Sequence, residues 1–203
     1  MKTPSPRMTL LAASAVCSLI VLDTNIVAVT LPSIARDLGA NFADIEWVVS
    51  AYMLAFAALL LPAGSIADRF GRKKTLLCGL ALFILASLGC GAAPNILFLD
   101  IARAIKGVGA ALLLTSALAT IGHAFHDETE RAKARAFWGA CMGVAMTAAP
   151  TVGGLIASFV GWRWIFYLNL PLGLLLVSMV WRNIDESRNE QSARLDPWGS
   201  LAF

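Results

Sequence analysis

Residues 8–31 read MTLLAASAVCSLIVLDTNIVAVTL, an apolar run that contains one charged side chain, Asp23. An α-helix of about 24 residues is about 36 Å long, which is enough to cross the hydrocarbon core of a bilayer. Lys2 and Arg7 precede the run, as basic residues precede the apolar core of a secretory signal. Because this run is longer than a signal core and continues to Leu31, we predict a retained first transmembrane helix.

Asp23 has two interpretations, because a carboxylate at membrane depth is costly and marks a functional site by default. In the structural interpretation, the Thr24 hydroxyl and the Asn25 amide satisfy the carboxylate within the same helix. In the functional one, Asp23 is a protonatable group. Burial favours its neutral form and a nearby cation favours its charged form, and these opposing effects suit a group that loads and releases a proton. We favour the functional interpretation.

The whole chain has the composition of a membrane protein. Hydrophobic residues make up 58% of it and charged residues only 14%, with a mean hydropathy of +0.73. A soluble domain carries about a quarter charged residues. We therefore predict an all-α integral membrane protein without a soluble domain. Nucleic-acid binding has no support, because no basic stripe lies outside the apolar segments. Five further segments are long and apolar enough to cross, at 47–67, 75–93, 96–121, 137–160 and 164–181.

The basic residues give an orientation for the resulting six-helix bundle over 8–181. Of the 16 Lys and Arg, 12 fall on one side of the spans, two inside the fourth span, and only Arg36 and Arg163 on the other side. Basic residues in short loops stay in the cytoplasm. We therefore predict a multi-pass protein of the inner (cytoplasmic) membrane, with residues 1–7 and the linker 182–195 in the cytoplasm.

The end of the sequence turns apolar again after this charged linker. Residues 195–203 read LDPWGSLAF. An Asp at the cap followed by a Pro at the first helical position is typical of a helix start. We therefore predict that a seventh transmembrane helix starts at 196–203 and is truncated there.

Metal-ligating chemistry is sparse in this sequence. His123 and His126 are three residues apart in the polar connection predicted at 122–135, but no third ligand is near, so we expect no metal site. The cysteines lie in apolar stretches without CxxC spacing and are expected to be small buried hydrophobes; they are Cys17, Cys78, Cys90 and Cys141.

The connection between the second and third spans reads GSIADRFGRKK at 64–74. Its glycines allow close helix approach and a tight turn, and its acid can cap the next helix or pair with a neighbouring base. A turn with a positive anchor would explain the bases alone. The full pattern resembles the cytoplasmic signature loop of the major facilitator superfamily, which implies a gating role for this loop. The residues that carry the pattern are Gly64, Asp68, Arg69, Gly71 and Arg72.

Further stretches resemble the fourteen-span drug:proton antiporters of multidrug resistance, a family within that superfamily. The stretches are LDT at 22–24 with LP at 31–32, WVVSAYML at 47–54, WRWIFYLNLPLG at 162–173 and LDPWG at 195–199. Together with the signature loop they extend over about residues 20–200, in the order and spacing of that family. The resemblance is therefore to a long, ordered set of motifs, which chance rarely produces.

The fourth span carries two cations in the stretch RAIKGVG at 103–109. The family pattern has Arg, two residues, Gln and then Gly, so Lys106 replaces the Gln. The resemblance implies that Arg103 takes part in proton coupling and substrate binding with Asp23 and Asn25. The structural alternative is an Arg that pairs with backbone carbonyls and shapes the bundle. For Lys106, snorkelling, deprotonation and disturbed coupling remain open.

The fifth span reads GACMG at 139–143 and APTVGG at 149–154, and resembles the antiporter motif of the superfamily. Ala149 stands where the family usually has Gly. The first two glycines form a small-xxx-small face for tight helix packing, and the proline breaks a backbone hydrogen bond and can kink the helix. The motif residues are Gly139, Gly143, Pro150, Gly153 and Gly154.

The resemblance also implies an architecture and a function. The chain would be the N-terminal half of a transporter, made of two three-helix repeats of inverted topology, with Asp23 and Arg103 facing the cavity. It would export small, lipophilic or cationic compounds, driven by the proton gradient, with no cofactor and no enzymatic activity. Its partners would be the lipid bilayer, a small-molecule substrate, and a complementary C-terminal bundle or a second copy. The alternative is a truncated, transport-inactive fragment, or a half-transporter that must associate with another bundle.

Overall fold

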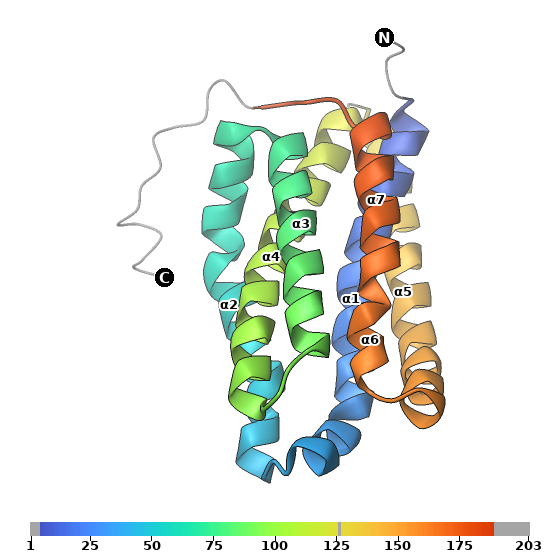
Figure 1. The fold of residues 1–203 in the computed structure, drawn as a ribbon. Helices are drawn as coiled ribbons and strands as arrows, with labels where there is room; N and C mark the ends of the chain where they lie inside the picture. Colours follow the sequence, from blue (N-terminus) through green and yellow to red (C-terminus); the bar gives the residue numbers. More distant parts are fainter. Residues whose placement is uncertain (1–4, 126, 189–203) are drawn as a thin grey trace.

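The computed structural model describes residues 5–125 and 127–188 as a bundle of long helices (Figure 1). No strand occurs in these two ranges. Six helical units, counting the last two helices together, are long and apolar enough to cross a membrane. The predicted all-α, six-span fold is therefore confirmed. The helices are α1 (Pro6–Leu38), α2 (Phe42–Phe70), α3 (Arg72–Gly91), α4 (Ile96–Ala124), α5 (Glu128–Phe159), α6 (Arg163–Tyr167) and α7 (Asn169–Asn183).

Helices α1, α2, α4 and α5 begin at side-chain caps that the sequence supplies. Asn41 and Asp44 form a reciprocal capping box at the start of α2. The side chain of Asn95 accepts a hydrogen bond from the backbone of α4, and that of Asp127 does so at α5. Each cap satisfies an N–H group that has no partner inside its helix.

Two connections between helices are shorter than the sequence indicated. Helix α1 continues to Leu38 and α2 begins at Phe42, while α4 continues to Ala124 and α5 begins at Glu128. The prediction of a polar connection over 122–135 is therefore wrong for most of its length. Hydropathy marks which part of a helix fits the membrane, whereas polar residues with good helix propensity extend the helix beyond it.

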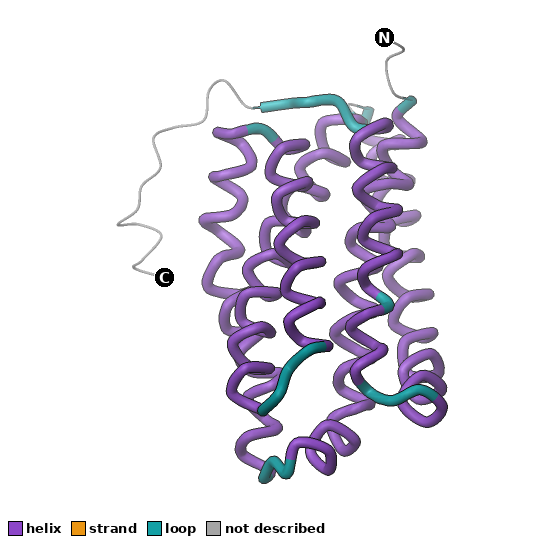
Figure 2. Tube along the Cα trace, viewed as in Figure 1, coloured by secondary structure: helices purple, strands orange, loops and turns teal. Residues whose placement is uncertain are grey.

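The sixth span is divided into α6 and α7 at Leu168. Figure 2 shows this turn as a short interruption within the span. Pro171 lies at the start of α7 and has no N–H to donate to the carbonyl of Tyr167, four residues before it. The missing hydrogen bond weakens the helix at this point, and the side chains that follow Leu168 start a new helical segment.

Helices α1 and α4 lie at the centre of the bundle and have equivalent neighbours. Helix α4 packs on α2 and α3, while α1 packs on α5 and α7; in addition, α1 contacts α4 and α3 contacts α7. When α1, α2 and α3 are matched with α4, α5 and α7, the contacts of α4 with α2 and α3 correspond to those of α1 with α5 and α7. The contacts of α1 with α4 and of α3 with α7 correspond to themselves. This is the packing pattern of two related three-helix units.

Apolar side chains form two clusters, one toward each end of the bundle. Phe83 and Leu113 belong to the first, and Ile34 and Leu99 to the second. The outer helices α2 and α5 turn large apolar side chains away from the bundle; Val144 of α5, for example, is 71% exposed. Such a surface is suited to lipid or to another helix bundle, and not to water.

The end of the bundle drawn uppermost in Figure 1 contains the start of α1, the α2–α3 connection and residues 184–188, which follow α7. Residues 184–188 cross this end without regular structure, and we call them the strap. The backbone N–H of Arg72 donates to the carbonyl of Ser187 over 2.9 Å, which places the strap beside α3. Residues 1–4, His126 and residues 189–203, including the seventh helix predicted at 196–203, lie outside the described residues.

Candidate functional site

Asp23 lies in the middle of α1 and faces the inside of the bundle. Its side chain is 1% exposed. The neighbouring polar side chains do not satisfy it, because the Thr24 hydroxyl donates to the Ile20 carbonyl and the Asn25 amide donates to the Val21 carbonyl. The structural interpretation in which Thr24 or Asn25 binds Asp23 is therefore wrong. Asn25 is partly buried and bonded within its own helix.

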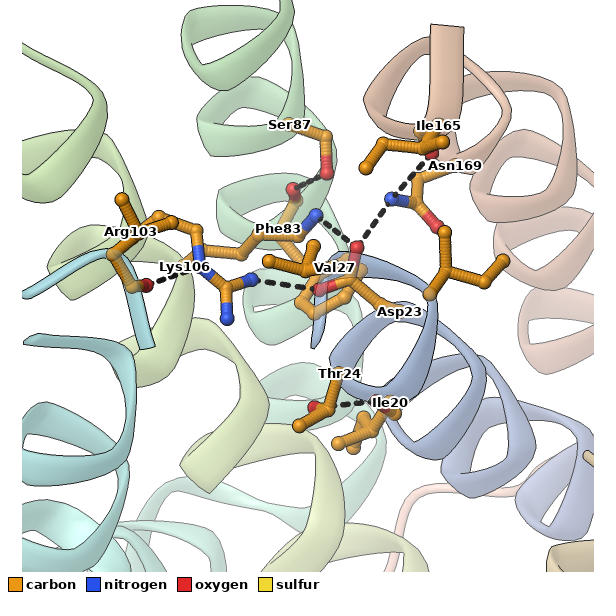
Figure 3. A network of polar contacts seen from close by, with 12 residues as sticks. Ile20, Asp23, Thr24, Val27, Phe83, Ser87, Arg103, Lys106, Ile165 and Asn169 are labelled. Atoms are coloured by element: carbon orange, nitrogen blue, oxygen red, sulfur yellow. Dashed lines mark hydrogen bonds and ion pairs between the residues drawn. The ribbon is translucent and has the colours of Figure 1, made fainter. Parts of the chain in front are cut away.

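Three donors from other helices satisfy the Asp23 carboxylate (Figure 3). Arg103 of α4 donates from Nη1 to Oδ2 over 3.0 Å. Lys106, one turn further along α4, donates from Nζ to Oδ1 over 2.6 Å. Asn169, the first residue of α7, donates from Nδ2 to the same oxygen over 2.7 Å. Both carboxylate oxygens thus accept hydrogen bonds, and the helices α1, α4 and α7 meet at this point. We call these four residues the charge cluster.

Backbone and aromatic groups hold the two cations of the charge cluster in place. The Nε of Arg103 donates to the Val48 carbonyl of α2 over 3.0 Å, and its guanidinium lies 4.2 Å from the centre of the Tyr52 ring. The Lys106 ammonium lies 4.6 Å from the ring centre of Phe83 and 5.0 Å from that of Phe166. A cation over an aromatic face is stabilised by the ring quadrupole.

The charge cluster is closed to solvent and electrostatically unbalanced. Arg103 and Lys106 are both 0% exposed. With all three ionisable groups charged, it holds two cations and one anion, a net charge of +1 in the interior. Desolvating an ion is expensive, and a buried pair is a weak source of stability. Two atoms of the charge cluster, Nη2 of Arg103 and Oδ1 of Asn169, have no hydrogen-bond partner. Each of these atoms can therefore still form a hydrogen bond.

The α2–α3 connection contains most of the predicted gating residues. Asp68 accepts hydrogen bonds from Nε of Arg72 at 3.2 Å and from Nη2 at 2.9 Å. Arg69 lies over the ring of Phe70 instead. Gly71 turns the chain with a φ of 109°, a conformation that favours glycine. Gly64 lies further back on α2, where a Cβ would meet nothing within 4 Å, so close helix approach does not require it.

The strap supplies the cap of α3, which Asp68 does not. The Glu186 carboxylate accepts hydrogen bonds from the backbone N–H groups of Lys73 and Lys74, at 3.1 and 3.2 Å. Lys73 also donates from Nζ to the Trp181 carbonyl over 2.8 Å. A carboxylate at a helix N-terminus satisfies free N–H groups and complements the helix dipole. The sequence analysis did not identify Glu186, because it is one acid among several in a charged segment.

At the opposite end, a second polar group ties three connections together. Asp37 at the end of α1 accepts hydrogen bonds from the Trp162 indole over 3.0 Å and from the Arg163 guanidinium. Arg163 also donates to the Ala93 carbonyl of the α3–α4 connection over 3.3 Å. The two ends of the bundle are therefore each closed by charged contacts, while the charge cluster lies between them.

The glycines of α5 divide into packed and unpacked positions. A Cβ on Gly153 would lie 3.0 Å from the Cγ2 of Ile26, so α1 and α5 approach closely there. A Cβ on Gly139, Gly143 or Gly154 would meet nothing within 4 Å. The face predicted for tight packing at Gly139 and Gly143 is thus open within the described bundle, and Pro150 lies inside the unbroken helix α5.

An apolar groove runs beside this open face of α5. Its volume is about 640 Å³, and α1, α5 and α7 line it. The lining includes Leu19, Leu22, Val144, Ala148 and Leu176. Asp23 and Arg103 do not line it, because the charge cluster is enclosed between α1 and α4. The structure therefore separates an apolar surface from the charged centre, where the resemblance implied one common cavity.

Asn169 is the cluster member that the sequence analysis missed. It lies within the quoted stretch 162–173, but a neutral amide at the start of an apolar span does not signal a buried charge site by itself. The signal that could have found it is the lack of a partner for a buried carboxylate. His126 lies outside the described residues, and within them no group of three His, Cys, Asp or Glu side chains gathers.

Comparison with known proteins shows which family this chain belongs to. The family model of the Major Facilitator Superfamily matches residues 13–202 of this chain. Among curated proteins, the chain is 39% identical over 196 residues to Multidrug resistance protein Stp of Mycobacterium tuberculosis, an alignment that covers 97% of this chain and 36% of that protein.

Two further relatives have names of the same kind. The chain is 34% identical over 201 residues to Drug efflux pump JefA of Mycobacterium tuberculosis, covering 99% of this chain and 40% of that protein. It is 42% identical over 183 residues to Puromycin resistance protein pur8 of Streptomyces alboniger, covering 90% and 36%. The chain therefore spans 36–40% of the length of these three relatives.

Proposed function

The chain belongs to the major facilitator superfamily, and we propose that it exports small molecules across the cytoplasmic membrane in exchange for protons, as part of a multidrug antiporter. The names of the three relatives support export of drug-like compounds. The apolar groove along α1, α5 and α7 supports lipophilic compounds. The chain contributes the N-terminal six-helix bundle of this antiporter.

The observation that carries the proposal is the charge cluster. It joins the central helix of one three-helix unit, through Asp23, to that of the other, through Arg103 and Lys106. Ionisable residues at membrane depth serve ion or proton pathways far more often than stability. Gain or loss of one proton changes the charge of this cluster by one and shifts the balance between two packings of α1 against α4. Alternating access requires such a bistable contact.

We assign the end with the α2–α3 connection and the strap to the cytoplasm. The basic residues Arg72, Lys73 and Lys74 gather there, which supports this orientation. The Asp68–Arg72 pair and the Glu186 contacts would open and close with the cytoplasmic entrance, so this connection acts as the gate. The energy comes from the proton gradient, and the proposal needs neither a cofactor nor a catalytic residue.

A second candidate function is that of a half-transporter that works only with another bundle. The open face at Gly139 and Gly143 supports it, since a small-residue face without a neighbour is suited to a partner helix. The coverage of 36–40% of the relatives' length also supports it. The partner is a complementary C-terminal bundle or a second copy of this chain.

The test is efflux of a lipophilic cationic dye from inverted membrane vesicles that contain only these 203 residues, with an imposed proton gradient. Gradient-driven dye movement that is lost in Asp23→Asn supports the antiporter. Asp185→Asn is the matched control, because Asp185 is an exposed aspartate of the strap. Efflux that persists in Asp23→Asn contradicts a coupling role for the charge cluster.

Absence of efflux, with the protein present in the membrane, supports the second candidate. Gly143→Cys then distinguishes its two forms, because position 143 lies on the open face of α5. Disulfide-linked dimers that form in this variant and not in the unmodified chain, which has an exposed Cys78, indicate a second copy as the partner. A monomer that stays inactive indicates a different bundle.

A further inference from the structure

We propose that Lys106, and not Asp23, holds the exchangeable proton of the charge cluster, and that Asp23 stays a carboxylate throughout the transport cycle. This inference deepens the proposed function and rests on it for its role in transport. The protonation assignment depends only on the geometry of Asp23, Arg103 and Lys106, and it can be tested without a transport assay.

The three donors around Asp23 can all be satisfied together only by an ionised carboxylate. Oδ2 accepts from Arg103, and Oδ1 accepts from both Lys106 and Asn169, at 2.6–3.0 Å. A proton on either oxygen would replace an acceptor by a donor at a position where donors already converge. At least one of these short hydrogen bonds would be lost, and the group that lost it would remain buried and unpaired.

The net charge of the charge cluster differs among its three available protonation states. With Lys106 neutral, Arg103 and Asp23 balance and the cluster has no net charge. With Lys106 charged, the net charge is +1. With Asp23 protonated, two cations remain without an anion and the net charge is +2. Because Arg103 cannot give up its proton in a protein, the least costly exchange in a dry interior is between the first two states.

Lys106 can lose a proton without moving its side chain. An ammonium group has three N–H donors, but Asp23 is the one hydrogen-bond acceptor within reach in the described bundle. The faces of Phe83 and Phe166 cover the ammonium instead. A neutral amine still donates one N–H to Asp23 and keeps its contacts with the two aromatic rings, so loss of the proton leaves neither Lys106 nor Asp23 unpaired.

The other groups around Lys106 do not compete for this role. Arg103 is on the same helix, and Cys90 of α3 is a buried thiol close enough to interact electrostatically with the amine. Tyr52 of α2 lies against Arg103, while α6 and α7 present Phe166 and Asn169, neither of which titrates. Asp23 is therefore the anionic partner of Lys106, and Lys106 is the group with a spare proton.

The resulting step is a simple proton transfer. When the bundle opens to one side, the Lys106 ammonium gives one proton to a water molecule and keeps the N–H electron pair as a neutral amine. The cluster passes from +1 to 0. When the bundle opens to the other side, water returns one proton to the amine. Asp23 and Arg103 remain an ion pair in both states and act as positioning residues for Lys106.

The experiment is a pH titration of the 203-residue chain in lipid nanodiscs, followed by NMR with ¹³C at the lysine Cε and the aspartate Cγ. Loss of one signal in Lys106→Gln identifies Lys106, and loss of one in Asp23→Asn identifies Asp23. The range from about pH 4 to about pH 11 brackets the ordinary behaviour of both residue types. We expect the Lys106 signal to move from its ammonium to its amine position while Asp23 stays at its carboxylate position.

Two results overturn the inference: movement of the Asp23 signal to the protonated position while Lys106 stays an ammonium, and no titration of either group. Lys106→Arg is the matched control, because arginine keeps the charge but cannot release a proton; it should abolish gradient-driven efflux, by at least about tenfold, without unfolding the chain. If no protein of the series shows efflux while Lys106 titrates as expected, transport by this chain alone is excluded, the half-transporter candidate is favoured, and the protonation assignment remains. Efflux with a titrating Asp23 rejects only the inference.

Discussion

Gly107 of α4 lies directly against the backbone of Tyr52 of α2, so that a Cβ at position 107 would collide with the Tyr52 carbonyl oxygen. The Tyr52 ring in turn covers the guanidinium of Arg103. Because Gly107 has no side chain, α2 can approach α4 closely at this point. This approach also places the Tyr52 ring over Arg103, which lies one turn before Gly107 on α4.

Gly107→Ala should lower the stability of the bundle by about 1–3 kcal/mol, the usual cost of overpacking a rigid site. Thermal unfolding in detergent measures it. Gly122→Ala on the same helix is the control, since its Cβ would meet nothing within 4 Å, and alanine favours the helix by up to about 1 kcal/mol. Equal effects of the two substitutions would contradict the close approach of α2 and α4.

Asp23→Asn should destabilise the chain by about 3–5 kcal/mol, because it leaves Arg103 and Lys106 buried without a counter-charge. Lys106→Gln should be tolerated much better, since Arg103 and Asp23 remain paired. The double variant should recover part of the loss, which makes the two changes non-additive. Unfolding of all four proteins in a denaturing detergent series measures this, and simple additivity would argue against one shared network.

Asn169→Ala should cost about 1.5–3 kcal/mol, the contribution of a hydrogen bond to a charged group. Asn25→Ala should cost less than about 1 kcal/mol, because its amide donates only to a carbonyl of its own helix. The same unfolding measurement compares these two asparagines. A larger effect at Asn25 than at Asn169 would contradict the contribution of the Asn169 hydrogen bond to the charge cluster.

Glu186→Ala should expose the N-terminus of α3. Amide hydrogen exchange at Lys73 and Lys74 should accelerate about fivefold, since a helix cap contributes about 1 kcal/mol. Glu130→Ala is the control, because this exposed glutamate pairs only with Lys133 in the described bundle. Exchange at Lys73 and Lys74 that is the same in both variants would mean that the strap does not hold α3 in solution.

Gly153→Leu should destabilise the contact of α5 with α1, whereas Gly154→Leu should have little effect on this chain. The two positions are adjacent, but only the Cβ at 153 would crowd Ile26. Thermal unfolding again gives the comparison. A loss of stability at Gly154 that matches the loss at Gly153 would indicate that another surface covers the outer face of α5.

Much of the fold follows from the sequence because lipid requires every spanning segment to satisfy its own backbone, so a long apolar run has one main solution. The meeting of Asp23 with Arg103 is also accessible to reasoning, since a charge at membrane depth must find a partner. The same reasoning applies to Lys106, which stands where the family pattern has Gln.

The remaining features depend on three-dimensional paths that no local pattern contains. Asn169 joins the charge cluster because α7 starts beside Asp23, and Glu186 caps α3 because the strap turns across the end of the bundle. The extension of α5 to Glu128 comes from a cap and from helix propensity, which hydropathy does not measure. Sequence reasoning therefore finds the membrane spans and their charges more readily than it finds neutral or exposed partners.

The strap also has a consequence for whatever polypeptide follows residue 188. Its hydrogen bonds to Arg72, Lys73 and Lys74 hold the chain at the start of α3. A segment that is fixed at both ends has fewer conformations available than a segment that is fixed at one end. Residues 184–188 thus fix the point at which the chain leaves the bundle, and this point lies beside the start of α3.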